Sequence, residues 1–395
     1  MHVYLFGFKI YAYRRIKHLL KYFIQFGLNN IKTLHVFRLL LLTWLVTKLI
    51  SFKLWFQLYR VFPRITAVDF IDFEALAFVD VSLAFISFLC IAFSLYKINS
   101  KIILSFICIE IVLCFFDVIR IQPLQFQMIL LSFIYVLQPK KFSLNLLLLI
   151  SATYLFAGLC KFNLGFINVN WSYLFLEQTL GIQRSFTQIS MIKASGFIIP
   201  FLEALAGIVL LTKYRKIACM GLIVFHLATL AYIGPFQLTI NYAVWPWNLS
   251  MILLLFYFAK QKHLSFNQIH FKATHQKIYL SFLFVFPILG FTNYYHPYAA
   301  FQLYQGKDTY LIVQSTSNKL AAFHQEKYQK LMPENQGLYT SLCRQITFSE
   351  FNVPVASVPW LHKKIRQTVQ SKISFGETRF YRLPYPYRKV VQIVD

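Results

Sequence analysis

Long apolar runs separated by short polar segments dominate the first three quarters of the chain. A membrane-spanning helix needs roughly 20 mostly apolar residues, and nine runs approach that length. They are 36–57, 75–96, 102–119, 123–138, 143–161, 194–212, 217–235, 240–259 and 278–294. The third and fourth are short and are compatible with one re-entrant pair. The pattern therefore predicts an all-α polytopic membrane protein with eight or nine transmembrane helices.

Basic side chains alternate between the predicted loops. Loops on the cytoplasmic side of a membrane are enriched in Lys and Arg, and such pairs or triplets occur near 97–101, 140–141, 213–216 and 260–262. The intervening loops mix acids with their basic residues, and the loop 235–239 has no charge. This predicts a cytoplasmic N-terminus and, for an odd number of spans, a C-terminal region in a bacterial periplasm or an organelle lumen. The bacterial inner membrane is the expected location.

The two ends of the chain differ from the apolar middle. Residues 1–32 hold six basic and no acidic side chains among many aromatics, which predicts a basic amphipathic segment on an anionic leaflet. An organelle transit peptide is the alternative. After the transmembrane domain 33–296, residues 297–395 hold 13 Lys/Arg and 6 Asp/Glu, with β-rich stretches at 309–316 and 389–395 and a possible helix at 357–370. We expect a small C-terminal α+β extracytoplasmic domain there.

The composition supports this class. Hydrophobic residues make up 58% of the chain and charged residues 13%, with a formal net charge of +25, whereas a soluble domain is about 25% charged. The 43 Phe and 24 Tyr exclude a disordered chain. We therefore expect the lipid bilayer as a partner and no nucleic acid. The six Cys form no CxxC motif, so neither a disulfide framework nor a metal site is predicted.

Three ionisable residues in the apolar part are candidate functional groups, because such side chains are costly at membrane depth. Lys161 ends the fifth run on the predicted outer side, where a lone Lys is unusual, although a snorkelling side chain is the alternative. Nearby Gly158 permits a close helix contact. Glu203 lies mid-span after Pro200, and His226 lies mid-span in the seventh run, where a packing role is the alternative.

The densest polar motif is NYAVWPWN at 241–248. Its Pro frees a backbone carbonyl, and an Asn side chain can satisfy that carbonyl or a ligand. Under the predicted topology, several residues lie toward the outer side, with Glu203 and His226 deeper. They are Lys161, Asn163, Asn241, Trp245, Trp247 and Asn248. We hypothesise a polar cavity that opens outward.

Acidic residues also occur in the second and third runs, where pairing with basic residues of the first run is the structural alternative to function. Asp80 lies in the second run, and Glu110 and Asp117 lie seven residues apart in the third. Their expected partners are Arg38 and Lys48 of the first run.

The segment YLFAGLCKFN at 154–163, followed by Trp171, resembles the AG-x-x-K stretch of the vitamin K-dependent γ-carboxylase and its bacterial HTTM-domain relatives. Further short matches follow in the same order: LEALAG at 202–207, FHL at 225–227, IGPF at 233–236, the WPWN motif, and a "VP" segment in FNVPVASVPW at 351–360. The resemblance covers roughly residues 33–260. It implies the family's helical fold and a Lys that deprotonates vitamin K hydroquinone, which corresponds to Lys161. The carboxylase has a large lumenal substrate-binding domain that about 100 residues cannot supply, so glutamate carboxylation is not implied.

This resemblance suggests a quinone-linked site. A Lys at a membrane boundary can act as a base near neutrality, and a quinol can reach it through the lipid. His226 would hydrogen-bond a quinol oxygen, Glu203 would orient it, and Trp245 and Trp247 would stack on the ring. The cofactor is otherwise unknown.

Three functions remain open at the level of sequence. The first is a membrane module whose tail, 297–395, binds or assembles with extracytoplasmic protein partners. The second is a carboxylase-like or quinone-linked membrane enzyme that uses Lys161 as its base. The third is a transporter, which inverted hydropathy repeats would support, and we see none.

Overall fold

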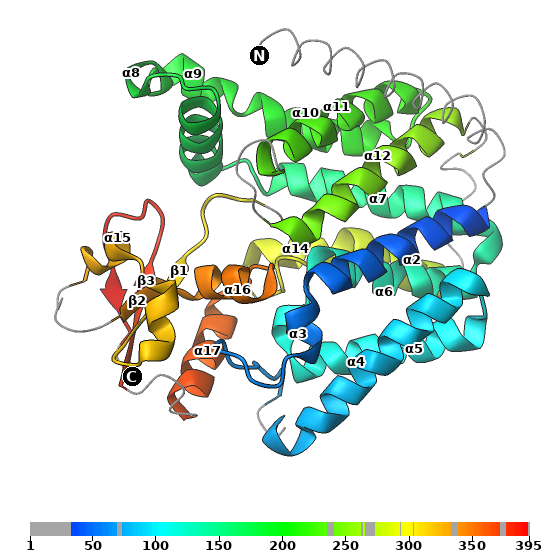
Figure 1. The fold of residues 1–395 in the computed structure, drawn as a ribbon. Helices are drawn as coiled ribbons and strands as arrows, with labels where there is room; N and C mark the ends of the chain where they lie inside the picture. The colour runs from blue at the N-terminus through cyan, green and yellow to red at the C-terminus, as the bar shows by residue number, and fades with distance from the viewer. Residues whose placement is uncertain are drawn as a thin grey trace, which may run out of the picture.

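The computed structural model describes residues 33–68, 73–234, 241–261, 264, 273–292, 294–302, 304–332, 339–371 and 377–393. The chain is mostly helical, with one small sheet near its C-terminal end (Figure 1). The basic segment 1–32 and the loop 235–239, for which the sequence makes predictions, lie outside the described residues.

The apolar part folds into a bundle of helices joined by short turns. Its elements are α2 (Thr33–Ile50), α3 (Phe52–Phe56), α4 (Phe73–Tyr96), α5 (Ser100–Phe116), η2 (Val118–Arg120), α6 (Pro123–Leu137), η3 (Pro139–Lys141), α7 (Phe142–Leu159), the π-helix η4 (Phe166–Thr179), α8 (Arg184–Thr187), α9 (Ser190–Ser195), α10 (Ile198–Val209), α11 (Arg215–Ile233), η5 (Tyr242–Val244), α12 (Trp245–Lys260), α13 (Thr274–Leu280), η7 (Ser281–Val285), α14 (Phe286–Leu289) and η8 (Gly290–Thr292). The sequence explains where two of these helices begin. The side chain of Asn99 caps α5 by accepting a hydrogen bond from the N–H of Lys101. Pro123 begins α6, at a position where its missing N–H loses no hydrogen bond within the helix.

Six helical stretches of the described chain are long and apolar enough to cross a membrane. They are Thr33–Ile50, Leu76–Tyr96, Pro139–Leu159, Ser190–Val209, Arg215–Ile233 and Tyr242–Lys260. They correspond to six of the nine predicted runs, and the chain is therefore a multi-helix membrane protein. The other three runs form α5 with 17 residues, α6 with 15 residues, and the broken run from α13 to η8. The total of eight or nine spans stays a prediction.

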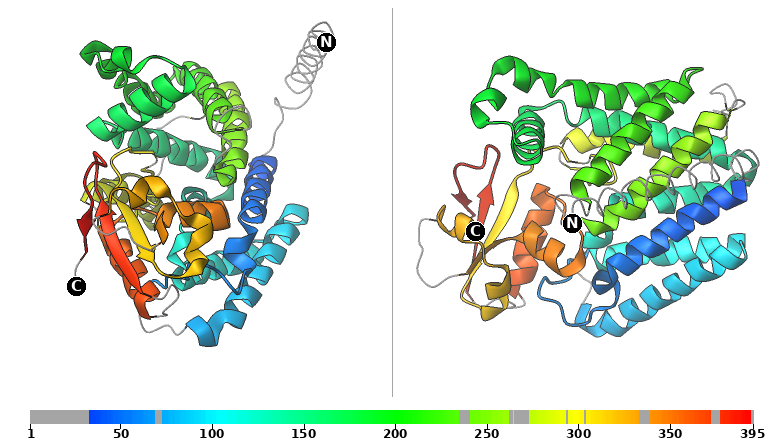
Figure 2. Two further views of the ribbon diagram at one scale, coloured as in Figure 1. Left: turned by 60° about the vertical axis from the view of Figure 1, so that its left-hand side comes forward. Right: turned by 45° about the horizontal axis from the view of Figure 1, so that its top comes forward.

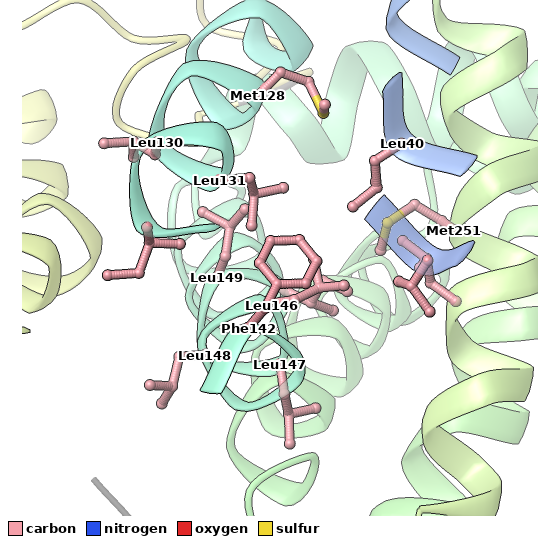
Figure 3. Close-up of a cluster of buried hydrophobic side chains, with 14 of the residues drawn as sticks. Leu40, Met128, Leu130, Leu131, Phe142, Leu146, Leu147, Leu148, Leu149 and Met251 are labelled. Atoms are coloured by element: carbon pink, nitrogen blue, oxygen red, sulfur yellow. The ribbon is translucent and has the colours of Figure 1, made fainter. Parts of the chain in front are cut away.

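Helix α7 is the centre of the bundle. Of its membrane-length window, 83% is buried, against 50% or less for each of the other five. Figure 3 shows Phe142 and Leu146 of α7 facing Leu131 of α6, Leu40 of α2 and Met251 of α12. An apolar helix that is buried all round, as α7 is, belongs in the interior rather than at the lipid boundary.

Small residues bring α10 very close to α7. A Cβ atom added to Gly158 would lie 2.5 Å from the backbone N of Ala204, and one added to Gly207 would lie 2.6 Å from the N of Leu155. Ser151 also hydrogen-bonds the carbonyl of Gly207. Small residues at membrane helix contacts allow this kind of backbone approach. The close contact expected from Gly158 is confirmed.

The tail forms the α+β unit expected from the sequence. Its elements are β1 (Tyr310–Ser315), η9 (Asn318–Phe323), α15 (Glu326–Gln329), β2 (Tyr339–Leu342), α16 (Cys343–Phe351), α17 (Pro359–Ser371), β3 (Thr378–Leu383) and the two-residue β4 (Val391–Gln392). The strands are antiparallel in the order β2-β1-β3-β4, with Ile312 opposite Leu342 on one side and Tyr381 on the other. The predicted strand at 309–316 and helix at 357–370 correspond to β1 and α17.

The tail shares a hydrophobic core with the first helices instead of standing apart from them. Trp55 of α3 and Leu113 of α5 belong to the same buried cluster as Phe351 of α16 and Leu361 of α17. Polar contacts reinforce this junction. The two carboxylate oxygens of Glu350 accept the backbone N–H groups of Val61 and Phe62, each at 2.8 Å.

The connections sort to opposite ends of the bundle (Figure 2). At the end with the tail, Gln122 Nε2 donates to the carbonyl of Pro354 at 3.1 Å and Asn352 Nδ2 donates to that of Ile50 at 3.0 Å. This end gathers the loops predicted to be outside.

The opposite end gathers the loops predicted to be inside. Arg38 donates to the carbonyl of Tyr96 at 2.9 Å, and Arg215 donates to that of Gln261 at 2.8 Å. The alternation expected from the loop charges thus agrees with the fold. Which end faces the cytoplasm stays a prediction.

Candidate functional site

Lys161 and Glu203 form a buried ion pair at the tail end of α7. Lys161 lies in the turn after α7 and Glu203 lies on α10, and Nζ and Oε2 are 2.5 Å apart. Both residues are at most 6% exposed. The close packing of α10 on α7 at Gly158 brings Glu203 within reach. A charge is tolerated at this depth when it is paired, and each residue supplies the other's partner.

A second polar chain runs across the bundle beside this pair. The Tyr154 hydroxyl of α7 hydrogen-bonds His226 Nε2 of α11, and His226 Nδ1 lies 2.7 Å from Asn248 Oδ1 of α12. Asn248 Nδ2 in turn donates to the carbonyl of Val244 at 2.8 Å. This last bond turns the amide oxygen of Asn248 toward the ring, so a neutral His226 donates from Nδ1 and accepts the Tyr154 proton at Nε2.

The two groups are electrostatic neighbours. Glu203 acts electrostatically on Tyr154, and Lys161 acts on His226. Tyr154 lies on α7, and Lys161 lies in the turn that directly follows this helix. The structure therefore unites Lys161, Glu203 and His226, all three of the predicted catalytic residues, with Asn248 in one buried region formed by α7, α10, α11 and α12.

Two further predicted residues lie at the outer margin, under the tail. Asn163 Nδ2 donates to the carbonyl of Gln305 at 3.2 Å, and Asn241 Nδ2 donates to the Tyr304 hydroxyl at 3.0 Å. The tail thus covers the side toward which the sequence predicted an open cavity. Asn241 has a left-handed backbone conformation, with φ of 52°, and its buried Oδ1 has no hydrogen-bond partner among the described residues.

The two predicted tryptophans have different neighbours. Helix α12 begins at Trp245, and residues two apart on a helix do not face each other. Trp245 packs on the ring of Tyr242, with centroids 4.9 Å apart, while Trp247 packs against the main hydrophobic core. The two rings thus lie in different surroundings, and their stacking on a ligand ring stays a prediction.

A second buried charge cluster lies between α2, α4 and α5. Lys48 Nζ is 2.5 Å from Glu110 Oε1 and 2.9 Å from the Ser87 hydroxyl, and it lies 3.6 Å from the ring centroid of Trp55. Glu110 also accepts a hydrogen bond from Gln125. The predicted Lys48–Glu110 pairing is confirmed, and this fully partnered cluster has a structural role.

The other two acids pair with arginines of predicted loops. Arg120 forms a bidentate pair with Asp80, and Arg60 NH1 lies 2.8 Å from Asp117 Oδ2. Arg38, the other expected partner, instead bonds the carbonyl of Tyr96. Loop arginines reach these acids because η2 and the 57–67 segment fold back over the helix ends.

Tyr154 is the residue of the site that sequence analysis missed. Tyrosines are common in this chain, so composition does not single it out. Its position seven residues before Lys161 is the feature of the sequence that could have identified it.

No three His, Cys, Asp or Glu side chains of the described chain gather as metal ligands, and none of the six cysteines forms a disulfide bond in the described structure. In comparisons with family models, with curated proteins and with solved structures, nothing matches the chain. The resemblance to the γ-carboxylase and HTTM proteins thus remains an expectation, and the site is interpreted from its own geometry.

Proposed function

We propose that this protein is a membrane enzyme that moves a proton to or from a lipid-soluble, hydroxyl-bearing substrate, such as a hydroquinone. The observation that carries the proposal is the convergence of Lys161, Glu203, Tyr154 and His226 in one buried region. A bundle held together by apolar packing does not need four such groups in one place. Intramembrane ionisable residues mark functional sites by default.

The ion pair suggests which of the two residues accepts the proton and which stabilises the resulting charge. In the paired state the Lys161 ammonium has no free lone pair, so the Glu203 carboxylate is the proton acceptor. When a substrate hydroxyl gives its proton to Glu203, the substrate becomes an oxyanion and the pair gains one positive charge. Lys161 then stabilises the oxyanion. This assigns Lys161 the role of a cation and differs from the base role that the resemblance implies.

The substrate class follows from the surroundings of the site. On α10, Phe201 and Leu202 are more than half exposed on the outer surface of the bundle, while the adjacent Glu203 is buried. One helix therefore separates the site from lipid, which suits a substrate that arrives through the bilayer. Asn241 Oδ1, which has no hydrogen-bond partner among the described residues, is a suitable acceptor for a second substrate hydroxyl, and Trp245 offers a ring face nearby.

The test compares two buried Lys–Glu pairs of the same chain. Full-length protein in mild detergent is titrated with menadiol and with decylubiquinol, and binding is followed by quenching of tryptophan fluorescence. Lipid extracts are also analysed for copurified quinone by mass spectrometry. The site variant is Lys161→Met/Glu203→Gln, and the matched control is Lys48→Met/Glu110→Gln.

We expect the wild type and the control variant to bind a quinol and the site variant to lose binding at least tenfold. The proposal is wrong if neither quinol binds the wild type and no quinone copurifies, or if the site variant binds as well as the wild type. A folding defect is recognised by size-exclusion chromatography of each variant.

A role of the tail in binding an extracytoplasmic protein is a second proposal. The observation that favours it is the firm junction of the tail with the bundle through Glu350 and the shared core, since this would hold a bound partner at a fixed distance from the membrane. A photo-crosslinking residue placed at exposed Lys330 in cells should capture one protein in stoichiometric amount. One at Phe78, on the outer face of α4, should not. Equal capture at both positions would contradict the role.

A further inference from the structure

A cavity of about 560 Å³ lies where the last apolar helical run meets the tail. It is bordered by η8, by the first eight residues of α17, by strand β3 and by Ile393, which follows β4. Its lining residues are Thr292, Tyr294, Pro359, Trp360, His362, Lys363, Arg366, Arg382 and Ile393. The cavity lies outside the site described above, which is formed by α7, α10, α11 and α12.

The cavity is strongly cationic. Lys363, Arg366 and Arg382 line it, and none of the described residues that line it is acidic. Neither Lys363 nor Arg382 forms an ion pair with another described residue, although ion pairs occur elsewhere in the tail. Three cations gathered around one hollow, with no acidic side chain among its described lining residues, are typical of a site for an anion.

A buried hydrogen-bond donor adds to this picture. The indole Nε1–H of Trp360 is buried and has no acceptor among the described residues. Leaving such a donor unsatisfied is costly, and an oxygen-rich anion in the adjacent cavity would satisfy it. The ring of Trp360 is held in place by His296, with centroids 6.2 Å apart.

The cavity is also placed at the level where lipid headgroups lie. Thr292 ends the apolar run that begins at Thr274, and Tyr294, which follows it, is 90% exposed. Tyr and Trp are enriched at the boundary between membrane and water. Tyr294 and Trp360 both line the cavity, so its mouth carries the aromatic residues expected at such a boundary.

We propose that this cavity binds a phosphate group, held by Lys363, Arg366 and Arg382 and by the N–H of Trp360. Arginine suits this chemistry because its planar guanidinium can bind phosphate oxygens in pairs. The position at the end of the apolar run favours the phosphodiester of an anionic phospholipid over a phosphate from solution. The binding does not depend on the proton-transfer function proposed above.

The test uses full-length protein in neutral detergent micelles and native mass spectrometry. The protein is titrated with phosphatidylglycerol, with phosphatidylcholine, and with phosphatidylglycerol in the presence of millimolar inorganic phosphate. The cavity variant is Lys363→Gln/Arg366→Gln. The matched control, Lys319→Gln/Lys327→Gln, removes the same charge from exposed tail positions that do not line the cavity.

We expect phosphatidylglycerol to bind the wild type and the control variant equally and to bind the cavity variant about 30-fold more weakly, since each cation near a membrane contributes roughly 1 kcal/mol. Trp360→Phe should weaken binding without changing the net charge. Competition by millimolar phosphate would identify a soluble phosphate as the ligand, and its absence would identify the lipid. Equal binding of the two lipids to the wild type, or equal behaviour of the cavity and control variants, would overturn the proposal.

Discussion

At the scale of single residues, the protein places nearly every buried charge next to an opposite one. Lys48 pairs with Glu110, Arg120 with Asp80, Arg60 with Asp117 and Lys161 with Glu203. The last pair lies beside the hydrogen-bonded chain of Tyr154 and His226. Whether a buried ion pair of this protein is a candidate for function therefore depends on the residues that surround it.

Breaking the Lys161–Glu203 pair from one side should be more harmful than removing it. Either single variant, Lys161→Met or Glu203→Gln, leaves one buried charge without its partner. Loss of one partner of a buried pair typically lowers the free energy of unfolding by about 3–5 kcal/mol. The double variant Lys161→Met/Glu203→Gln leaves no unpaired charge and should recover part of that loss. Thermal unfolding in detergent measures all four proteins, and strictly additive single effects would contradict the coupling.

Acid should weaken the tail through its buried histidines. Burial lowers the pKa of His362 to about 4, with a contribution from nearby Arg382, and lowers that of His296 to about 3. A histidine with a lowered folded pKa contributes stability above its unfolded value near 6.5, and this stability is lost as the pH falls toward the folded value. For His362 alone the loss is about 3 kcal/mol.

The quantity to measure is the free energy of unfolding of the tail between pH 7 and pH 4. It is compared in the wild type, in His362→Phe and in His362→Phe/His296→Phe. The pH dependence should shrink in the first variant and again in the second. Burial raises the pKa of Glu350, so this carboxyl favours the folded state at low pH and gives a slope of opposite sign that all three proteins share. A wild type with no loss of stability in this window would refute the assignment.

At the scale of elements, contacts between helices depend on a few small residues. Helices α7 and α10 approach each other closely at Gly158 and Gly207. This approach positions Glu203 against Lys161. A substitution at these positions acts on the site through the spacing of two helices and leaves the charged groups themselves unchanged.

Gly158→Val should therefore separate α10 from α7. Its first added carbon would meet the Ala204 backbone at 2.5 Å, and overpacking of this kind costs about 1–3 kcal/mol. Gly221→Ala on α11 is the control, because its added carbon meets nothing within 4 Å and alanine favours a helix by up to about 1 kcal/mol. Thermal unfolding and quinol binding should both decline in the first variant only, and equal stability of the two variants would contradict the packing argument.

Sequence patterns predicted helices and strands better than they predicted the contacts between them. The apolar runs identified the six membrane-length helices, and the β-rich stretch 309–316 and the predicted helix 357–370 correspond to β1 and α17, because periodicity and apolar length act locally. The strands β2 and β3 and the helix α16 were missed, since their burial comes from pairing with distant segments. For the site, unusual residues such as Lys161 and Glu203 were visible at membrane depth, but Tyr154 and the opposed directions of Trp245 and Trp247 depend on where helices begin and which faces meet.

At the scale of the whole molecule, one end of the bundle differs in character from the other. The tail, the helices η4, α8 and α9, and the loops 57–67 and 117–122 all gather there, whereas the fully described connections at the opposite end are short turns (Figure 1). The candidate site, the buried Arg64 and Arg120, and the cationic cavity all lie toward the end with the tail. A single orientation in the membrane therefore decides which compartment can supply their ligands.

That orientation can be measured with introduced cysteines. Lys330→Cys lies on the exposed tail and Lys140→Cys lies in the turn at the opposite end. If Lys- and Arg-rich loops are cytoplasmic, a membrane-impermeant maleimide should label Lys330→Cys in intact cells and Lys140→Cys only after permeabilisation. The chain without an added cysteine is the control, and the reverse labelling pattern would invert the predicted topology.

The shared core between the tail and α3 has a consequence for biogenesis. The ribosome makes Trp55 and Leu113 well before Phe351 and Leu361, which belong to the same buried cluster. Until the tail has been made, the apolar surface of the first helices lacks this cover, and Val61 and Phe62 lack the carboxylate of Glu350. The nascent chain thus needs either protection by a chaperone at that face or rapid arrival of the tail, and a truncated product would be recognised by quality control through this uncovered surface.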